Sequence, residues 1–381
     1  MKTLSQKALE IKPSGIRKFF DLVQNSQDII SLGVGEPDFS TPWGITEHAI
    51  YQLEKGRTSY TSNYGLIELR REIALLQEKS FKSNYNPDNE ILITVGVSEA
   101  LDLSFRTILN EGDEVIVPVP NFVSYIPLIT LAGGVPVIID TSVSDFIVTK
   151  EQIESKITPK TKAIIIAYPN NPTGAVISKE KLKEIVDVVL KHDLWLISDE
   201  VYNRLVYDGE PISASTFMKD NLILLNGFSK TYAMTGWRIG YVACKKEVMD
   251  QMVKIHQYNA MCAPVMAQYA AIEALKHGQK DIEMMRQSYE LRRNYVYKRF
   301  KEIGFEVHKP EGAFYIYPNI KKYGLKDEDF ALRLLQEQKV AVVPGSAFSE
   351  GNYDNIRCCY AASMNDLKEA LKRIEIFVNN L

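Results

Sequence analysis

The stretch N-G-F-S-K-T-Y-A-M-T-G-W-R-I-G-Y, residues 226–241, follows the apolar run Leu222 to Leu225 and carries two cations, Lys230 and Arg238. The apolar run is typical of a strand inside a sheet, so both cations belong to the interior of a domain. A lone buried cation is costly, so each is expected to have an anionic partner or a chemical task. The stretch therefore predicts a functional site at the end of a buried strand.

Short apolar runs alternate with helical patterns along the first three quarters of the chain. The runs lie at 91–95, 114–118, 136–140, 162–168, 194–198, 222–226 and 238–243. Several are apolar on both faces, as in a parallel sheet covered by helices. The order predicts an α/β fold with a seven-stranded, mostly parallel sheet. The connection between the last two runs is short for a parallel crossover, so one of them is expected to run antiparallel.

The pattern changes after about residue 285. A long charged helix precedes short strands expected at 305–308, 314–317, 340–343 and 356–360, and two more helices follow. The first forty residues are rich in Gly and Pro and are expected to pack on the rest without a regular element. We therefore predict a large domain over 46–284 and a small α+β domain formed by 1–45 and 285–381.

Composition excludes several classes of protein. With 381 residues, 45% hydrophobic and 24% charged, the chain resembles an ordinary soluble enzyme. Its net charge of −3 gives no excess of positive charge for binding nucleic acid. No apolar run reaches membrane-spanning length, and the N-terminus lacks the apolar core of a signal peptide. The four cysteines form no C-x-x-C pair and predict reduced thiols in a cytoplasmic protein. The scattered histidines predict no metal site.

Polar and aromatic residues follow the predicted strands, at the edge where an open α/β sheet binds ligands. Each has an ordinary structural alternative, such as a helix cap, a turn or core packing, but together they describe one ligand. A phosphate would suit the helix N-terminus at Val97 and Ser98 together with Arg238. Phe122 would suit a flat ring, and Asp199 would suit a nitrogen in that ring. Asn171 and Tyr202 would suit a phenolic oxygen, and Lys230 would suit an aldehyde. That ligand is pyridoxal 5′-phosphate.

Six motifs carry a resemblance to a known family. N-P-T-G, S-D-E-V-Y and S-K-T-Y-A-M-T-G-W-R-I-G resemble the signatures of class I, fold-type I pyridoxal-phosphate-dependent aminotransferases. G-E-P-D-F near the start, Y-x-x-x-x-G-x-x-x-L-R at 60–70 and I-R-C-C-Y-A near the end are similar to the same family. The resemblance covers essentially the whole chain, in order. It implies the fold-type I architecture, with a large cofactor-binding domain and a small domain.

The resemblance also implies roles around the cofactor. Lys230 matches the lysine that binds the cofactor's aldehyde and then moves the substrate proton, and Asp199 matches the partner of the pyridine nitrogen. Asn171 and Tyr202 match the pair that binds the ring oxygen, and Phe122 takes the place of the stacking aromatic. Arg238 matches a phosphate clamp, with Ser229 a further donor. The position three before the lysine, often a serine in relatives, is Gly227 here.

Substrate and partner contacts are implied in the same way. Arg357 matches the arginine that binds the substrate's α-carboxylate, and Gly35 matches a backbone contact to that group. Ile16 belongs to a segment that covers the substrate in relatives. Tyr60 matches a tyrosine that reaches the cofactor phosphate of the neighbouring subunit, which implies a homodimer with shared sites.

The implied reaction moves an amino group from an L-amino acid to 2-oxoglutarate by a ping-pong mechanism. Aromatic substrates are favoured, because the stretch 257–264 offers Tyr258, Asn259 and Met261 but no arginine for a second carboxylate. Aspartate and N-acetyl-diaminopimelate are the alternatives, and a C–S β-lyase of the same fold is a third. A transcription regulator would need a DNA-binding domain, for which the N-terminal forty residues leave no room. A dehydrogenase would need the absent G-x-G-x-x-G fingerprint.

Overall fold

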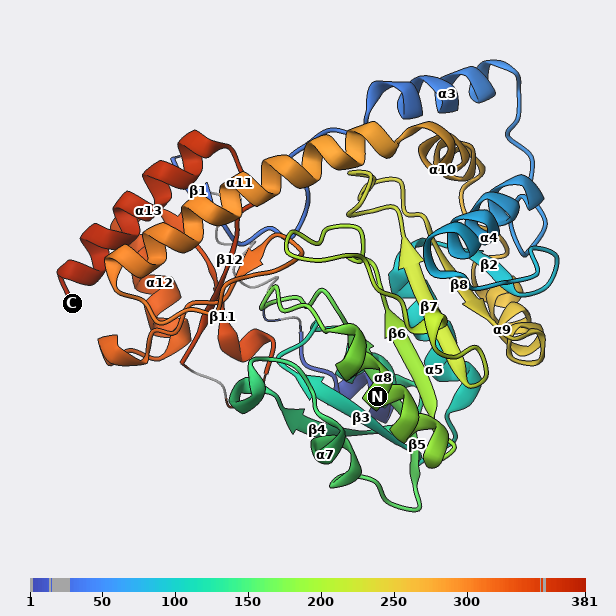
Figure 1. The fold of residues 1–381 in the computed structure, drawn as a ribbon, viewed down its shortest axis with the longest axis horizontal. Helices are drawn as coiled ribbons and strands as arrows, with labels where there is room; N and C mark the ends of the chain where they lie inside the picture. Colours follow the sequence, from blue (N-terminus) through green and yellow to red (C-terminus); the bar gives the residue numbers. More distant parts are fainter. Residues whose placement is uncertain (1–2, 14, 16–27, 350, 352–353) are drawn as a thin grey trace.

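The computed structural model describes residues 3–13, 15, 28–349, 351 and 354–381. It consists of a large sheet wrapped by helices and a smaller part, and the long helix α11 (Gln279–Ile303) runs from one to the other (Figure 1). Ile16, expected to cover the substrate, lies outside the described residues.

The large sheet has seven strands in the described part of the chain. In spatial order they are β2 (Ile91–Thr94), β8 (Gly240–Cys244), β7 (Leu222–Gly227), β6 (Trp195–Asp199), β5 (Thr161–Ala167), β3 (Glu114–Val119) and β4 (Val135–Asp140). Neighbouring strands are parallel except β8, which is antiparallel to both β2 and β7. The predicted fold class and the predicted antiparallel strand are therefore confirmed.

Both faces of this sheet are buried except along the edge strand β4, where Val135 and Ile138 are exposed, and the inner strands are therefore almost continuously apolar. Ile223 and Leu225 of β7 pack under α5 (Gly96–Ile108), α6 (Tyr125–Leu131) and α9 (Lys246–Asn259). Leu222 and Leu224 of the same strand face the opposite helices. These are α3 (Trp43–Glu54), α4 (Ile67–Phe81), α7 (Lys150–Glu154), α8 (Lys179–Lys191) and α10 (Val265–His277).

The smaller part is built on two short sheets. β9 (Tyr315–Ile316), β12 (Ile356–Cys359) and β11 (Val343–Pro344) are antiparallel, and β1 (Ile30–Ser31) pairs in parallel with β10 (Val340–Ala341). The helices α11, α12 (Asp327–Gln338) and α13 (Met364–Asn379) pack on them around a second apolar core. The strands and helices of this part form an α+β arrangement, and its assignment as a separate small domain stays a prediction. Short 3₁₀ helices span Ser142–Ser144, Ala214–Thr216, Lys321–Tyr323 and Gly345–Ala347.

Two local expectations were wrong. The segment 305–308 forms no strand; Glu306 makes only an isolated bridge with Asn319, and the ring of Phe305 packs on Phe300 of the preceding helix. The N-terminal region does contain regular elements, α1 (Gln6–Glu10) and β1, and β1 gains its hydrogen bonds from β10, more than 300 residues away.

The predicted domain limit at 284/285 falls inside the continuous helix α11, and those limits stay a prediction. Among the described residues no helix has the length and apolar character to cross a membrane.

Candidate active site

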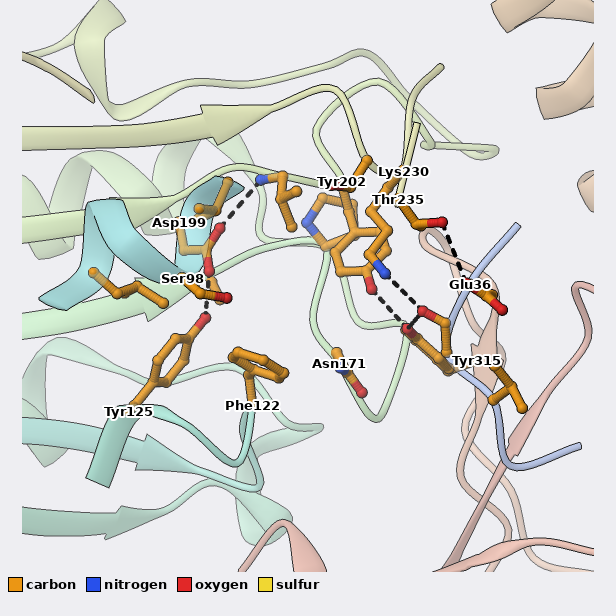
Figure 2. Close-up of a pocket in the computed structure, with 18 of the residues that line it drawn as sticks. Glu36, Ser98, Phe122, Tyr125, Asn171, Asp199, Tyr202, Lys230, Thr235 and Tyr315 are labelled. Atoms are coloured by element: carbon orange, nitrogen blue, oxygen red, sulfur yellow. Dashed lines mark hydrogen bonds between the residues drawn. The ribbon is translucent and has the colours of Figure 1, made fainter. Parts of the chain in front are cut away.

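A cavity of about 360 Å³ opens at the carboxyl ends of β5, β6 and β7, beside the N-terminus of α5. It lies between the large sheet and the small-domain strands, and it collects side chains from segments far apart in sequence (Figure 2). Its size suits a small-molecule ligand. The predicted site residues that line it are Gly35, Val97, Ser98, Phe122, Asn171, Asp199, Tyr202, Ser229, Lys230, Arg238 and Arg357.

Lys230 lies in the loop after β7 and points across the cavity. Its Nζ donates a hydrogen bond to the backbone oxygen of Gly35 at 2.6 Å. Burial lowers the pKa of Lys230 to about 8; the thiol of Cys359 opposes this shift, and Arg357 adds to it. A lysine whose pKa lies this low offers a neutral amine near neutral pH, as a nucleophile or a general base requires.

Asp199, the last residue of β6, is a buried carboxylate aimed into the cavity. Burial raises its pKa to about 6, while hydrogen bonds from Tyr125 and the Val201 N–H favour its charged form. The Tyr125 hydroxyl donates to Oδ2 at 2.7 Å, and the Val201 N–H donates to Oδ1 at 3.3 Å. The arrangement can accept a hydrogen bond from a protonated ring nitrogen, because both oxygens are already oriented.

Two tyrosines connect the sheet to the small domain. The hydroxyls of Tyr202 and Tyr315 are 2.6 Å apart, and the Tyr315 hydroxyl lies 3.3 Å from the Gly35 oxygen. Burial raises the pKa of Tyr202, so it is a neutral phenol that can donate a hydrogen bond at neutral pH. Lys230 Nζ lies 6.0 Å from the centre of the Tyr202 ring.

Arg357, on β12, is a buried cation with spare hydrogen-bonding capacity. Its side chain has an exposed fraction of 2% and lies 4.6 Å from the Tyr315 ring centre. Nη1 donates to Asn171 Oδ1 at 3.0 Å and Nη2 to the Gly33 oxygen at 2.5 Å. Within the described part of the chain its Nε has no hydrogen-bond partner and no carboxylate pairs with it. A buried guanidinium in this state is suited to a carboxylate ligand.

The opposite end of the cavity has the donors that a dianion would require, and it is called the dianion site below. The guanidinium of Arg238 lies so close to Gly96 that a Cβ there would be 2.7 Å from Nη2. A Cβ on Gly240 would be 2.8 Å from the Val97 nitrogen. These two glycines let the arginine, β8 and the first turn of α5 converge. The first N–H groups of a helix have no intrahelical acceptor, so Val97 and Ser98 present free donors beside the arginine.

Some predicted residues have other positions. Tyr60 does not line the cavity, and its exposed fraction is 83%. Gly227 ends β7 behind the dianion site, where a Cβ would be 2.9 Å from Val97 Cγ2 and 3.2 Å from Gly240 Cα. A serine there would have to displace Val97, so this chain has no room for the residue that relatives often carry.

Several residues of the cavity were missed from the sequence, and four of them make side-chain hydrogen bonds there: Glu36, Tyr125, Thr235 and Tyr315. Tyr125 holds Asp199, Tyr315 contacts Tyr202, and Thr235 donates to Glu36 across the cavity mouth at 3.2 Å. Tyr125 lies three residues after Phe122, and that proximity is the one sequence signal for it. Tyr315 and Glu36 gave no signal, because their partners are distant in sequence. The described residues contain no group of three or more His, Cys, Asp or Glu side chains placed to hold a metal.

Comparisons with known proteins give the same family. The family model described as aminotransferase class I and II matches residues 27–374. YugH of Bacillus subtilis (strain 168) is 50% identical, over 99% of this chain and 98% of that protein. Aromatic-amino-acid aminotransferase 2 of Thermococcus litoralis is 45% identical, over 98% of this chain and 97% of that protein. The solved structure of aspartate aminotransferase from Thermus thermophilus with maleate has a TM-score of 0.95 at 36% identity, covering 99% of this chain and 100% of that one.

The chain belongs to the class I and II aminotransferase family. It is an aminotransferase, and its cofactor is pyridoxal 5′-phosphate. The residues that line the cavity fit that group: the first N–H groups of α5 together with Arg238 would hold its phosphate, Asp199 would pair with its ring nitrogen, and Lys230 would bind its aldehyde.

Proposed function

We propose that this aminotransferase moves the amino group of an aromatic L-amino acid to 2-oxoglutarate in two half-reactions. The observation that carries the substrate class is the cation content of the cavity. Among the described residues, Arg238 and Arg357 are the arginines that line it. With Arg238 directed at a phosphate and Arg357 at an α-carboxylate, neither is left for a distal carboxylate. Val34, Leu101 and Phe122 add apolar surface to the walls.

The proposed roles follow from the contacts. Arg357 binds the substrate's α-carboxylate through its fork, with Asn171 and the Gly35 backbone beside it. The bound cofactor supplies an electron-withdrawing ring that makes the substrate's Cα proton acidic. Lys230 Nζ would take this proton from Cα and deliver it to the cofactor carbon that carries the aldehyde; in the reverse half-reaction the same Nζ would move a proton from that carbon to the Cα of the second substrate. Asp199, held by Tyr125, keeps its charge opposite the ring nitrogen, and Tyr202 donates to the ring oxygen.

A substrate panel tests this proposal. Phe, Tyr, Trp, Asp, Ala and Leu are compared at fixed 2-oxoglutarate, and kcat/KM is measured for each. The aromatic amino acids should give the highest values. If Asp exceeded Phe and Tyr by about tenfold, which is 1.4 kcal/mol of transition-state binding, the proposed substrate class would be wrong. N-acetyl-diaminopimelate is assayed in the same panel as a further candidate substrate. Pyruvate release from a cysteine conjugate tests the β-lyase alternative.

We also propose that the active unit is a homodimer. Tyr60 and Tyr258 have exposed fractions of 83% and 88%, and Met261 of 47%. Asn63 Nδ2 donates to the Met261 oxygen at 2.8 Å, which joins the two segments on one surface. Exposed apolar and aromatic residues gathered in this way suit an interface with a second copy. Sedimentation should give twice the chain mass, and Tyr60→Ala should weaken cofactor binding; a monomer with full cofactor affinity would contradict the proposal.

A further inference from the structure

A buried carboxylate stands behind the dianion site, outside the cavity. Glu99 lies on the first turn of α5, with a side-chain exposed fraction of 7%, and its Oε2 accepts the N–H of Val95 at 2.5 Å. Val95 is the residue that immediately precedes Gly96, where the backbone turns with a φ of +74° into the helix. The carboxylate therefore closes the turn that sets the direction of the Val97 and Ser98 N–H groups.

The second oxygen of Glu99 is held from another helix. Oε1 lies 2.9 Å from Nδ1 of His256, whose side chain has an exposed fraction of 0%. His256 is on α9, which packs against α5 on the same face of the sheet. Its Nε2 is buried and has no hydrogen-bond partner among the described residues. Burying an imidazole with one nitrogen unsatisfied is costly, so the bond to Glu99 is the polar interaction that orients this ring.

The turn is also fixed from inside the sheet. The hydroxyl of Thr94, at the end of β2, donates to the Gly96 oxygen at 3.0 Å. Thr94 and Glu99 thus hold the two sides of the same turn, one from the strand and one, through His256, from α9. A helix N-terminus binds an anion well only when its N–H groups are already oriented, because reorientation would subtract from the binding free energy.

We propose that Glu99 and His256 are positioning residues for phosphate binding: His256 holds Glu99, and Glu99 holds the turn that aims the first N–H groups of α5 at the cofactor's phosphate. This inference rests on the proposed phosphate site at Val97, Ser98 and Arg238. Neither residue touches the cofactor, since neither lines the cavity.

The test compares two ligands that differ only in the phosphate. Dissociation constants of the cofactor-free chain for pyridoxal 5′-phosphate and for pyridoxal are measured by absorbance titration. Glu99→Ala should weaken binding of the phosphorylated ligand by about tenfold, the usual effect of losing a charge-assisted hydrogen bond. Pyridoxal binding should change by less than about twofold, because its contacts are at Lys230 and Asp199. Glu99→Gln keeps an oxygen for the Val95 N–H and should recover most of the loss.

Asp102 provides the matched control. It is on the same helix and pairs with the exposed Arg106, so Asp102→Ala removes a carboxylate from α5 without touching the turn. It should leave both constants unchanged. If the Glu99→Ala chain does not fold, His256→Leu removes the anchor while filling much of its volume, and it should weaken binding of the phosphorylated ligand alone.

The outcomes distinguish a failure of the proposed phosphate site from a failure of the positioning role of Glu99 and His256. If the wild-type chain bound pyridoxal 5′-phosphate and pyridoxal equally, the proposed phosphate site at Val97, Ser98 and Arg238 would be wrong. A wild-type preference that survives Glu99→Ala and His256→Leu would overturn only the positioning role. Equal weakening of both ligands would also overturn it, since that result indicates general loss of structure. Failure of Glu99→Gln to recover affinity would mean that charge, rather than the hydrogen bond to Val95, supports the site.

Discussion

Arg357 and Asn171 meet across the cavity, with Nη1 of the arginine donating to Oδ1 of the amide at 3.0 Å. The first residue comes from β12 of the small domain and the second from the loop after β5 of the large sheet. The amide thus connects the carboxylate end of the cavity to the ring end. Arg357 Nε has no hydrogen-bond partner in the described chain, and we propose that a substrate carboxylate pairs with this guanidinium.

Replacing Arg357 by lysine should damage substrate binding selectively. A lysine cannot reproduce the planar fork, so kcat/KM should fall on the order of 100-fold, mostly through KM. Cofactor affinity should stay near the wild-type value. Steady-state kinetics with an amino acid and an absorbance titration with the cofactor measure the two effects. Arg333→Lys, in an exposed pair with Glu337, is the control and should change neither. Unchanged KM in Arg357→Lys would exclude Arg357 as the carboxylate site.

Lys230 should be reactive at a lower pH than an ordinary lysine. Burial lowers its pKa to about 8, and only the neutral amine is a nucleophile, so its reactivity should rise with pH and level off above that value. Acylation of the cofactor-free chain, followed by peptide mass spectrometry, gives the midpoint. A lysine-containing peptide should show a midpoint near about 10.4. A midpoint for Lys230 equal to that of the peptide would contradict the effect of burial.

Cofactor affinity should depend on pH through Asp199. Burial raises the pKa of this carboxyl to about 6, so below that pH it is protonated and cannot pair with a protonated ring nitrogen. Affinity should therefore fall as the pH drops through about 6. Tyr125→Phe removes a donor that favours the charged form, so the fall should move to higher pH by about one unit. Titrations across pH 5 to 8 measure this, with Tyr168→Phe as a buried tyrosine control on another contact.

A shift toward lower pH in Tyr125→Phe would show that the hydroxyl does not stabilise the Asp199 charge. An unchanged profile in wild type between pH 5 and 8 would show that Asp199 is not the ring partner.

Gly227→Ser should destabilise the fold without improving phosphate binding. The new Cβ would lie 2.9 Å from Val97 Cγ2 and 3.2 Å from Gly240 Cα, so the strand and the first turn of α5 must separate. Overpacking of this kind costs about 1–3 kcal/mol. Denaturant unfolding measures the loss, and the double variant with Val97→Ala should recover part of it by removing the crowding side chain. Full stability of the single variant would mean that the turn adjusts freely.

Much of the fold could be predicted because the signals are local. The inner strands of the large sheet are buried on both faces, and continuous apolar runs identify them without knowledge of their partners. The antiparallel β8 followed from the length of one connection. The segment 305–308 finds a backbone partner only in one isolated bridge, which its own sequence does not reveal, and β1 was missed because its hydrogen bonds come from β10.

The candidate site divides in the same way. The sequence by itself determined which chemical groups the chain offers: a lysine, a carboxylate, two arginines and a helix N-terminus, each in or next to a predicted strand. Only the tertiary structure decided that Tyr125 holds Asp199, that Tyr315 bridges to Tyr202, and that Glu99 with His256 holds the turn before α5. The physical reason is distance along the chain. These contacts join segments 74, 113 and 157 residues apart, and hydrogen bonding between such segments depends on how the helices and sheets pack.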